Sequence, residues 1–192
     1  MTNLLPHDGT VFYMPSVFNE VESSLIFTTL LSEADWQHDV VKIFGKVHIT
    51  SRKVAWYGDE DFSYSYSNST KVALPWTKTL FEVKQRVEQH CATKFNSCLL
   101  NLYHNGNEGM GWHSDDERVL GINPQIASVS FGAPRKFLFK HKKSDEGISM
   151  ILENGSVLLM KDETQHFWKH TLPKSRRVHH PRINLTFRKF IG

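Results

Sequence analysis

The amino-acid sequence predicts an α+β fold, mainly β, in which N-terminal helices pack on one sheet of a β-sandwich or barrel. Two observations lead to this prediction. Two stretches before residue 95 repeat apolar residues at helical spacing, and after Ser97 the chain changes to short β-type runs separated by Gly, Pro, Asn or charged turns. The chain has 192 residues, is 40% hydrophobic, and shows no internal repeat or linker-like stretch. We therefore expect a single domain that covers residues 1–192.

The first predicted helix follows Pro15. Ser16 is a suitable N-cap, and the residues after it place an apolar stripe on one face of a helix. The stripe consists of Val17, Phe18, Val21, Leu25, Ile26 and Leu30. Such stripes are more often core than partner surface, so we expect this one to be buried.

The second predicted helix covers residues 75–91. Pro75 is tolerated in a first turn, and one face of the helix is apolar. That face carries Trp76, Leu80, Val83 and Val87. We expect this face also to contribute to the core.

The β-type runs lie at 97–104, 126–131, 135–140, 148–152, 157–161, 166–171 and 183–189. The last run is the most informative, because its polar and apolar side chains alternate between two faces. The polar face carries Arg182, Asn184, Thr186 and Arg188, and the apolar face carries Ile183, Leu185 and Phe187. A half-exposed strand with two solvated arginines would show the same alternation. Asn101 and Tyr103 share a face of the first run, which favours a polar ligand face backed by core.

The pair His113-x-Asp115 and the later His170 are the predicted metal ligands. Residues two apart in an extended segment point to the same side, so His113 and Asp115 can bind one ion while Ser114 points away. Two imidazoles and one carboxylate form the facial triad that leaves half of an octahedral iron(II) shell open. An H-x-D pair alone occurs by chance in many chains, so the prediction depends on the combination with the last strand.

A zinc site is the alternative for these histidines. His166 and His170 are four residues apart, as in helical zinc sites, and zinc favours four ligands. However, the expected Glu between them is absent, and Phe167 and Trp168 are more typical of a strand. We therefore favour iron(II).

The two arginines of the last strand fit recognition of a dicarboxylate cosubstrate. A planar guanidinium binds a carboxylate through two parallel hydrogen bonds. An extended strand rises ~3.3 Å per residue, so Arg182 and Arg188 lie ~20 Å apart and serve opposite ends of the site. Together with the triad, this indicates a 2-oxoglutarate-dependent oxygenase.

Charge and cysteine content limit the partners and the compartment. The net charge is +3, but residues 173–192 contain six Lys and Arg residues and no acid, which favours a polyanion such as nucleic acid over a purely solvated basic tail. Cys91 and Cys98 lack metal-type spacing and are interpreted as free thiols. No signal peptide or membrane span is recognisable, so we expect an intracellular protein, cytoplasmic if bacterial and nuclear if eukaryotic.

Several segments resemble the AlkB family of nucleic-acid demethylases over residues 40–190. They are Asn101-Leu-Tyr103, Trp112-His-Ser-Asp115-Asp-Glu117, Ile126-Ala-Ser-Val-Ser-Phe-Gly132, His170 and Pro181-Arg-Ile-Asn-Leu-Thr-Phe-Arg188. Phe44-Gly-Lys46 and Arg52-Lys53...Tyr57-Gly-Asp59 resemble the members that act on double-stranded DNA.

The resemblance implies a double-stranded β-helix, or jelly roll, at 96–192, preceded by helices and a nucleotide-recognition lid at 1–95. It implies that His113, Asp115 and His170 bind Fe(II), and that the cosubstrates are 2-oxoglutarate and O2. Arg182, helped by Asn101 and Tyr103, is expected to bind the distal carboxylate of 2-oxoglutarate. Arg188 and Asn184 are expected nearer the metal-bound end.

Substrate residues are also suggested by the resemblance. We expect Phe44 to enter the gap left by a flipped base, although a core residue at a strand end would have the same sequence. Tyr64 and Tyr66 are candidates to stack on the base together with His113, and Glu117 to contact its edge; ordinary surface tyrosines are the alternative. The phosphate-binding candidates are Arg52, Lys53, Arg176 and Arg177.

The predicted function is DNA repair by oxidative demethylation of N-alkylated bases such as 1-methyladenine and 3-methylcytosine. The reaction consumes O2 and 2-oxoglutarate and releases formaldehyde, succinate and CO2. We expect a monomer that acts on duplex DNA. Two alternatives stay open: the same chemistry on RNA or protein, and a non-catalytic nucleic-acid-binding jelly roll.

Overall fold

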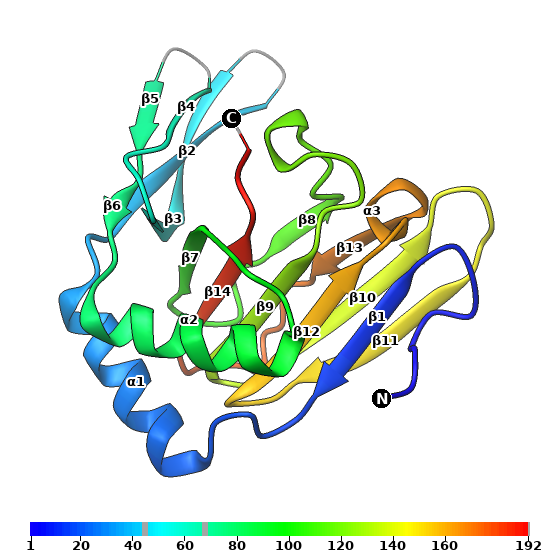
Figure 1. Ribbon diagram of the computed structural model, residues 1–192, viewed down its shortest axis with the longest axis horizontal. Helices are drawn as coiled ribbons and strands as arrows, with labels where there is room; N and C mark the ends of the chain where they lie inside the picture. The colour runs from blue at the N-terminus through cyan, green and yellow to red at the C-terminus, as the bar shows by residue number, and fades with distance from the viewer. Residues whose placement is uncertain (44–45, 67–68, 192) are drawn as a thin grey trace.

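Two antiparallel β-sheets lie face to face in the computed structural model (Figure 1). The structure describes residues 1–43, 46–66 and 69–191, and it describes their side chains except at 41–46 and 64–71. The larger sheet has the order β1-β12-β9-β14-β7-β3-β2, and β6 pairs with β3 in parallel. Its strands are β1 Thr10–Met14, β2 Gln37–Ile43, β3 Lys46–Gly58, β6 Leu74–Pro75, β7 Ser97–Tyr103, β9 Ile126–Gly132, β12 Ser156–Lys161 and β14 Arg182–Arg188.

The smaller sheet has the order β11-β10-β13-β8. Its strands are β8 Met110–His113, β10 Arg135–His141, β11 Gly147–Leu152 and β13 Trp168–Leu172. A core of buried side chains fills the space between the two sheets, with Ile126 and Leu158 from the larger sheet against Phe139 and Trp168 from the smaller one. A separate hairpin pairs β4 Ser63–Tyr66 with β5 Ser69–Val72.

Two helices cover the outer face of the larger sheet (Figure 1). They are α1 Glu20–Glu33 and α2 Lys78–Cys91; a short α3 Thr164–Phe167 precedes β13, and a 3-10 turn, η1, covers Arg118–Leu120. Leu30, Leu80 and Val87 are fully buried against Leu100 and Leu185 of the sheet. The predicted fold class, mainly β with helices packed on one sheet, is confirmed. None of the helices within the described residues is long and apolar enough to cross a membrane.

The first helix begins later than the sequence predicts. Asn19, not Ser16, is the N-cap: its side chain accepts from the Glu22 peptide at 3.0 Å, and Glu22 accepts in return from the Asn19 peptide at 2.9 Å. This capping box satisfies two free peptide donors at the helix start. Ser16 has a φ of 57°, in the left-handed region, so it cannot be part of a right-handed helix. The prediction that the apolar stripe is buried is wrong for two of its residues, since Val21 and Leu25 are 79% and 68% exposed.

The second helix also starts later, at Lys78 with Thr77 as its cap, and Pro75 belongs to β6. Its apolar face is buried as predicted at Leu80, Val83 and Val87. The runs after Ser97 match strands with ends shifted by a residue or two, except that His166 lies in α3 and not in a strand. The predicted runs include no counterpart of β1, of β2 to β6 or of β8, although His113 of β8 was expected in an extended segment. Since β1 and β3 join β7 in one sheet, the sheet extends well beyond the 96–192 segment.

Candidate metal centre and its pocket

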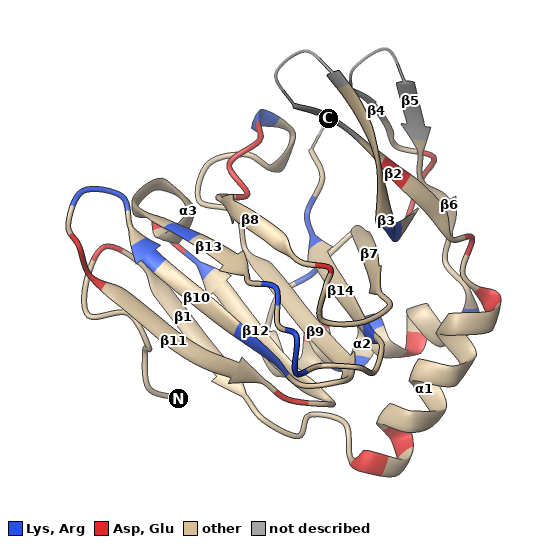
Figure 2. Ribbon diagram, turned by 180° about the vertical axis from the view of Figure 1, so that it is seen from behind, with Lys and Arg blue, Asp and Glu red and all other residues tan. Residues whose placement is uncertain are grey.

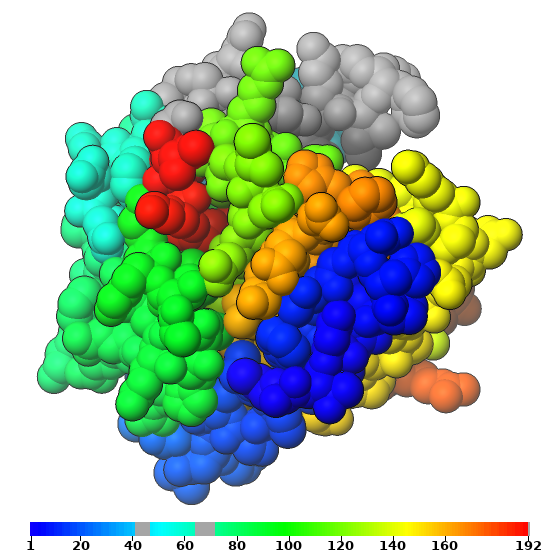
Figure 3. Space-filling model, turned by 45° about the vertical axis from the view of Figure 1, so that its right-hand side comes forward, coloured from blue at the N-terminus to red at the C-terminus, as the bar shows by residue number. Residues whose placement is uncertain are grey.

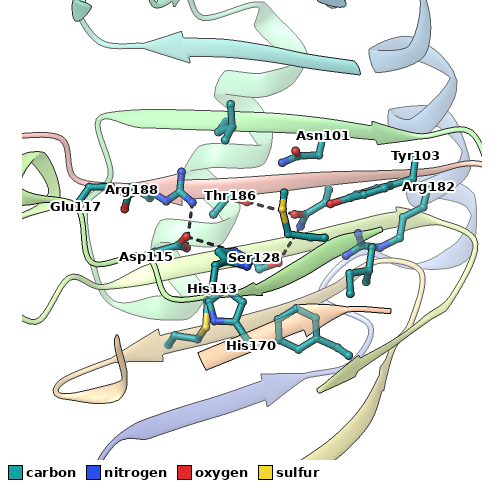
Figure 4. Close-up of a pocket in the computed structure, with 16 residues that line it drawn as sticks. Asn101, Tyr103, His113, Asp115, Glu117, Ser128, His170, Arg182, Thr186 and Arg188 are labelled. Carbon is teal, nitrogen blue, oxygen red and sulfur yellow. Dashed lines mark hydrogen bonds and ion pairs between the residues drawn. The ribbon is translucent and has the colours of Figure 1, made fainter. Parts of the chain in front are cut away.

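His113, Asp115 and His170 meet where the smaller sheet faces β14 (Figure 4). His113 ends β8, Asp115 follows it, and His170 lies on the neighbouring β13, directly opposite His113 in register. One ligand atom from each residue lies within 4.8 Å of the other two, and the two imidazole centroids are 4.3 Å apart. Strand pairing therefore brings the third ligand to the first two from 55 residues away in the sequence.

The surroundings hold Asp115 and His170 in the protonation states that bind metal. Burial alone would raise the pKa of Asp115, but the charges of Arg188, His170 and His113 and a hydrogen bond from Arg188 outweigh it and lower the pKa to about 2. Burial lowers the pKa of His170 to about 3, against the opposing effect of Asp115. Near neutral pH the site thus presents a carboxylate and a neutral imidazole, which are the forms a cation requires.

Two further residues fix the turn that carries Asp115. The Gln165 side-chain oxygen accepts a hydrogen bond from the Asp115 peptide N–H at 2.9 Å, and Gln165 is 1% exposed. The Ser114 hydroxyl donates to the Trp168 carbonyl oxygen at 3.0 Å. Sequence reasoning missed Gln165. Its place depends on α3, which no local pattern predicted.

A pocket of about 760 Å³, open mouth included, extends from the triad along β7 and β14. The predicted side chains lie along its wall, because alternate residues of these adjacent strands face the smaller sheet. The strands pair in register, with Arg182 opposite Tyr103 and Asn184 opposite Asn101. The side chains on this wall are Asn101, Tyr103, Arg182, Asn184, Thr186 and Arg188.

Arg182 is a buried cation at the end of the pocket away from Arg188 (Figure 4). It is 2% exposed, its Nη2 donates to the Ser130 hydroxyl at 2.9 Å, and its Nε has no hydrogen-bond partner. Burial lowers the pKa of Arg182 to about 10. No carboxylate within 1–43, 46–66 and 69–191 forms an ion pair with it. An unpaired buried guanidinium is costly, so this position suits an anionic ligand.

The two asparagines are engaged within the protein. Asn184 donates to the Ser128 hydroxyl at 2.8 Å and to the Val129 carbonyl at 3.0 Å, and accepts from Thr186 at 3.2 Å. The Asn101 oxygen accepts a hydrogen bond from Arg52. Both amides are therefore held in place along the pocket wall.

The predicted phosphate-binding role of Arg52 is wrong. Arg52 is 7% exposed and its guanidinium is directed inward, where it bonds to Asn101 and pairs with Asp39. A side chain buried in this way cannot reach a DNA backbone. Instead, Arg52 supports the wall of the pocket.

The other predicted substrate residues have different positions. Glu117 is exposed at the mouth of the pocket, close enough to Arg188 for their charges to interact. Arg176 and Arg177 are exposed in the loop between β13 and β14. Phe44 and the side chains of Tyr64 and Tyr66 lie outside the described residues. The helical zinc pair does not form, since His166 is exposed on α3 and His170 is buried on β13.

Comparison with known proteins identifies the family. A model of the 2OG-Fe(II) oxygenase superfamily matches residues 10–188. The chain is 40% identical over 186 residues to DNA oxidative demethylase ALKBH2 of Mus musculus, covering 91% of this chain and 78% of the relative. It is 35% identical over 184 residues to alpha-ketoglutarate-dependent dioxygenase alkB homolog 3 of Homo sapiens, covering 91% and 64%. The chain belongs to the AlkB family of 2OG-Fe(II) oxygenases.

The fold agrees with this membership. The solved structure of OsALKBH1 aligns with a TM-score of 0.69 at 15% identity, covering 93% of this chain and 97% of that chain. A 2OG-Fe(II) oxygenase from Burkholderia pseudomallei aligns with a TM-score of 0.63 at 12% identity, covering 95% and 85%. At these identities the likeness concerns the fold alone. The AlkB resemblance found in the sequence is confirmed by the relatives.

As a member of the AlkB family, the protein is a dioxygenase that uses Fe(II), 2-oxoglutarate and O2. The residues present fit these groups. Two imidazoles and one carboxylate are the donors expected for non-haem Fe(II), and the unpaired Arg182 suits a carboxylate at the other end of the pocket.

Proposed function

We propose that this AlkB-family protein is a DNA repair enzyme that removes N-methyl groups from bases such as 1-methyladenine and 3-methylcytosine. One observation carries the proposal: the triad and the unpaired cation of Arg182 line a single pocket, in a chain whose relatives include proteins named DNA oxidative demethylase. A non-catalytic nucleic-acid binder would not need both features. We also propose that the protein acts as a monomer and that residues 1–192 form one catalytic domain.

In this proposal, His113, Asp115 and His170 hold the iron. Arg182 binds the distal carboxylate of 2-oxoglutarate beside Tyr103, whose ring lies 5.6 Å from the guanidinium, and Asn101 completes that end. Arg188 and Asn184 line the end near the metal. When bound, iron would activate O2, and one of its oxygen atoms would hydroxylate the methyl C–H bond while the other enters 2-oxoglutarate, which leaves as succinate and CO2. The hydroxymethyl product then loses formaldehyde and restores the base.

The chain's own residues would prepare this chemistry by charge and orientation. Arg188 keeps Asp115 ionised, and Gln165 and Ser114 hold the turn on which Asp115 lies. The hydrogen bonds of Asn184 to Ser128 and Val129 keep that side chain against the sheet, so the space above it stays open for ligand. No residue is required as a covalent nucleophile.

A flipped, methylated base in duplex DNA is the proposed substrate. Such a base is cationic and poorly paired, so it is extruded at lower cost than a normal base. Glu117 at the pocket mouth is placed to contact its edge, with His113, Tyr64 and Tyr66 as stacking partners and Phe44 filling the gap in the duplex. Arg176 and Arg177 are proposed to bind phosphates. Lys136 and Lys140 on β10 and Lys169 on β13 add positive charge on these strands (Figure 2).

Formaldehyde release tests this function. Purified protein is supplied with iron, ascorbate and 2-oxoglutarate, and with the same methylated sequence as duplex DNA, single-stranded DNA or RNA. We expect formaldehyde and succinate in equal amounts, most from duplex DNA, and none with His170→Ala. Faster turnover of the RNA would replace the proposal with an RNA demethylase. Absence of formaldehyde from every oligonucleotide would reject nucleic-acid demethylation.

A further inference from the structure

A second group of metal-binding side chains lies apart from the triad. His7 and Asp8 come from the N-terminal segment and His141 from the end of β10. The Asp8 Oδ2 atom is 3.1 Å from His7 Nδ1 and 3.3 Å from His141 Nε2. One ligand atom from each of the three residues lies within 4.8 Å of the others. These separations are those of donors around one ion at bond lengths of ~2.0–2.2 Å.

His141 provides independent support for a ligand at this position. The residue is 5% exposed, and its Nε2 atom is buried without a hydrogen-bond partner. Aromatic contacts with Trp168 and Phe167, at centroid distances of 5.0 and 6.2 Å, fix the imidazole plane. This nitrogen is directed toward Asp8 Oδ2, which lies 3.3 Å away without forming a hydrogen bond. A metal ion between the two groups would pair both of them.

The far nitrogens of both histidines are also engaged. His7 Nε2 contacts a carboxylate oxygen of Glu146, and His141 Nδ1 lies 2.9 Å from the Ser144 hydroxyl. Metal-bound histidines usually donate a hydrogen bond from their second nitrogen, and the outer partner fixes the ring and its tautomer. Glu146 stands where such an acceptor is expected for His7. His141 Nδ1 instead accepts from the Ser144 peptide N–H in the metal-free protein, and in the metal-bound protein it would have to donate to the Ser144 hydroxyl.

We propose that His7, Asp8 and His141 bind a divalent transition-metal ion, zinc by the character of the donors, separately from the catalytic iron. Two imidazoles and one carboxylate with a water molecule complete the four-coordinate shell that zinc favours. The ion would be structural, since the three ligands join separate parts of the chain. It would tie the N-terminal segment to β10 and to Trp168, whose Nε1 donates to the His7 carbonyl oxygen at 3.1 Å.

Without a metal ion, hydrogen bonds and ion pairs can hold the same side chains together. One contact distinguishes the metal-free state from the metal-bound state. The Ser144 peptide N–H lies 3.0 Å from His141 Nδ1, so the metal-free imidazole carries its proton on Nε2, toward Asp8. Metal binding must displace this proton and place one on Nδ1, where the Ser144 hydroxyl is the acceptor. Ser144→Ala should therefore weaken metal binding about tenfold, in the range found for outer-shell partners.

The site lies at the surface, so metal ions can reach it and its ligands can be substituted. Figure 3 shows the N-terminal segment, in blue, lying on the surface beside the segments in yellow and orange. His7 and Asp8 have side chains that are 42% and 44% exposed. Asp8 has a φ of 52°, a conformation that Asn adopts readily, so Asp8→Asn removes the ligand charge without backbone strain.

Metal stoichiometry tests the proposal. Chelator-treated protein is dialysed against buffered zinc, and bound zinc is counted by elemental analysis for wild type, His7→Gln, Asp8→Asn and His170→Ala. We expect two equivalents in wild type and one in each variant, because zinc also enters the triad. His179→Gln changes an exposed histidine outside both groups and should retain two. Circular dichroism in chelator confirms that each variant is folded.

Cobalt(II) provides a second readout. A tetrahedral site gives intense visible absorption, whereas the open triad favours higher coordination and weak absorption. The intense bands should appear in wild type and His170→Ala and disappear in His7→Gln and Asp8→Asn. A single zinc equivalent in wild type, or two equivalents that persist in both N-terminal variants, would overturn the second site. Neither result bears on the iron centre or on demethylation.

Discussion

The Nη2 atom of Arg188 lies 3.0 Å from Oδ2 of Asp115, so the last strand supplies a cation to the carboxylate of the metal triad. The other oxygen, Oδ1, lies 3.7 Å from His113 Nε2, on the side of the proposed ion. The guanidinium balances the carboxylate charge within a buried site, where an unpaired charge would be costly. One strand, β14, therefore serves the metal at Arg188 and the far end of the pocket at Arg182.

Arg182→Lys should weaken 2-oxoglutarate binding about 10- to 100-fold, which corresponds to loss of one charged, bidentate interaction. Lysine keeps the positive charge but lacks the planar fork that matches a carboxylate. Titration of 2-oxoglutarate into the Mn(II)-loaded protein measures this effect. Mn(II) affinity itself should stay within about twofold, because Arg182 is remote from the triad. Unchanged 2-oxoglutarate affinity would reject the assignment of Arg182.

Gln165→Met should weaken metal binding about tenfold, as is typical when an outer-shell partner is lost. Methionine is similar in size, but it cannot accept the hydrogen bond from the Asp115 peptide that Gln165 accepts at 2.9 Å. Mn(II) titration, under conditions where both proteins are folded, measures the change. His166→Gln alters an exposed residue of the same helix and serves as the control. If both variants bind Mn(II) like wild type, Gln165 does not position Asp115.

The parts of the site that the sequence predicted are those with a local signal. Polar and apolar residues alternate along 182–188, so four polar side chains lie on one face of the strand. These four side chains line the pocket. Gln165 and Arg52 lack such a signal. Gln165 acts through α3, and the direction of Arg52 depends on Asp39 and Asn101, which are distant in sequence.

The missed elements have a similar explanation. In α1, helical periodicity marks Val21 and Leu25 as core, but packing against the sheet buries the face that carries Leu30 and leaves Val21 and Leu25 exposed. The strand β3 gains its place by pairing Lys53–Gly58 with Ser97–Leu102. Pairing between such distant segments is set by the whole sheet, and it leaves little trace in the local sequence.

Glu88→Gln should lower the free energy of unfolding at pH 7 by about 1–3 kcal/mol, because it weakens a buried charged network. Glu88 is 6% exposed and contacts Lys94 at 2.6 Å, Lys84 at 3.4 Å and the Phe95 peptide at 3.0 Å. Burial alone would raise the pKa of Glu88, but the Lys94 and Phe95 hydrogen bonds and the Lys charges lower it.

The sign of the pH dependence follows from that shift. A carboxyl group whose pKa is lower in the folded state stabilises the protein above its ordinary pKa of 4.5, and this contribution disappears as the pH falls through the folded value. Urea denaturation at pH 7 and at about pH 3 should therefore show a deficit that shrinks in acid. Glu82→Gln, an exposed position on the same helix, should have little effect at either pH. A constant deficit at both pH values would contradict the role of the charge.

Phe44→Ala should reduce turnover of a methylated base in duplex DNA more than in a single strand, because only the duplex has a gap to fill after the base is flipped. Comparing initial rates of formaldehyde release on the two substrates measures the difference. An equal loss on both would indicate a general structural defect, and the proposal that Phe44 fills the gap in the duplex would have to be abandoned.

Leu30→Ala and Leu25→Ala form a matched pair that tests which face of α1 belongs to the core. Leu30 is fully buried and packs in the cluster that joins both helices to the sheet, so its truncation should lower the free energy of unfolding by about 2–5 kcal/mol. Leu25 is 68% exposed, so its truncation should change that value by no more than about 0.5 kcal/mol. Urea denaturation measures both. Comparable losses would mean that Leu25 is covered in solution, and the helical periodicity of the sequence would then have identified a buried face after all.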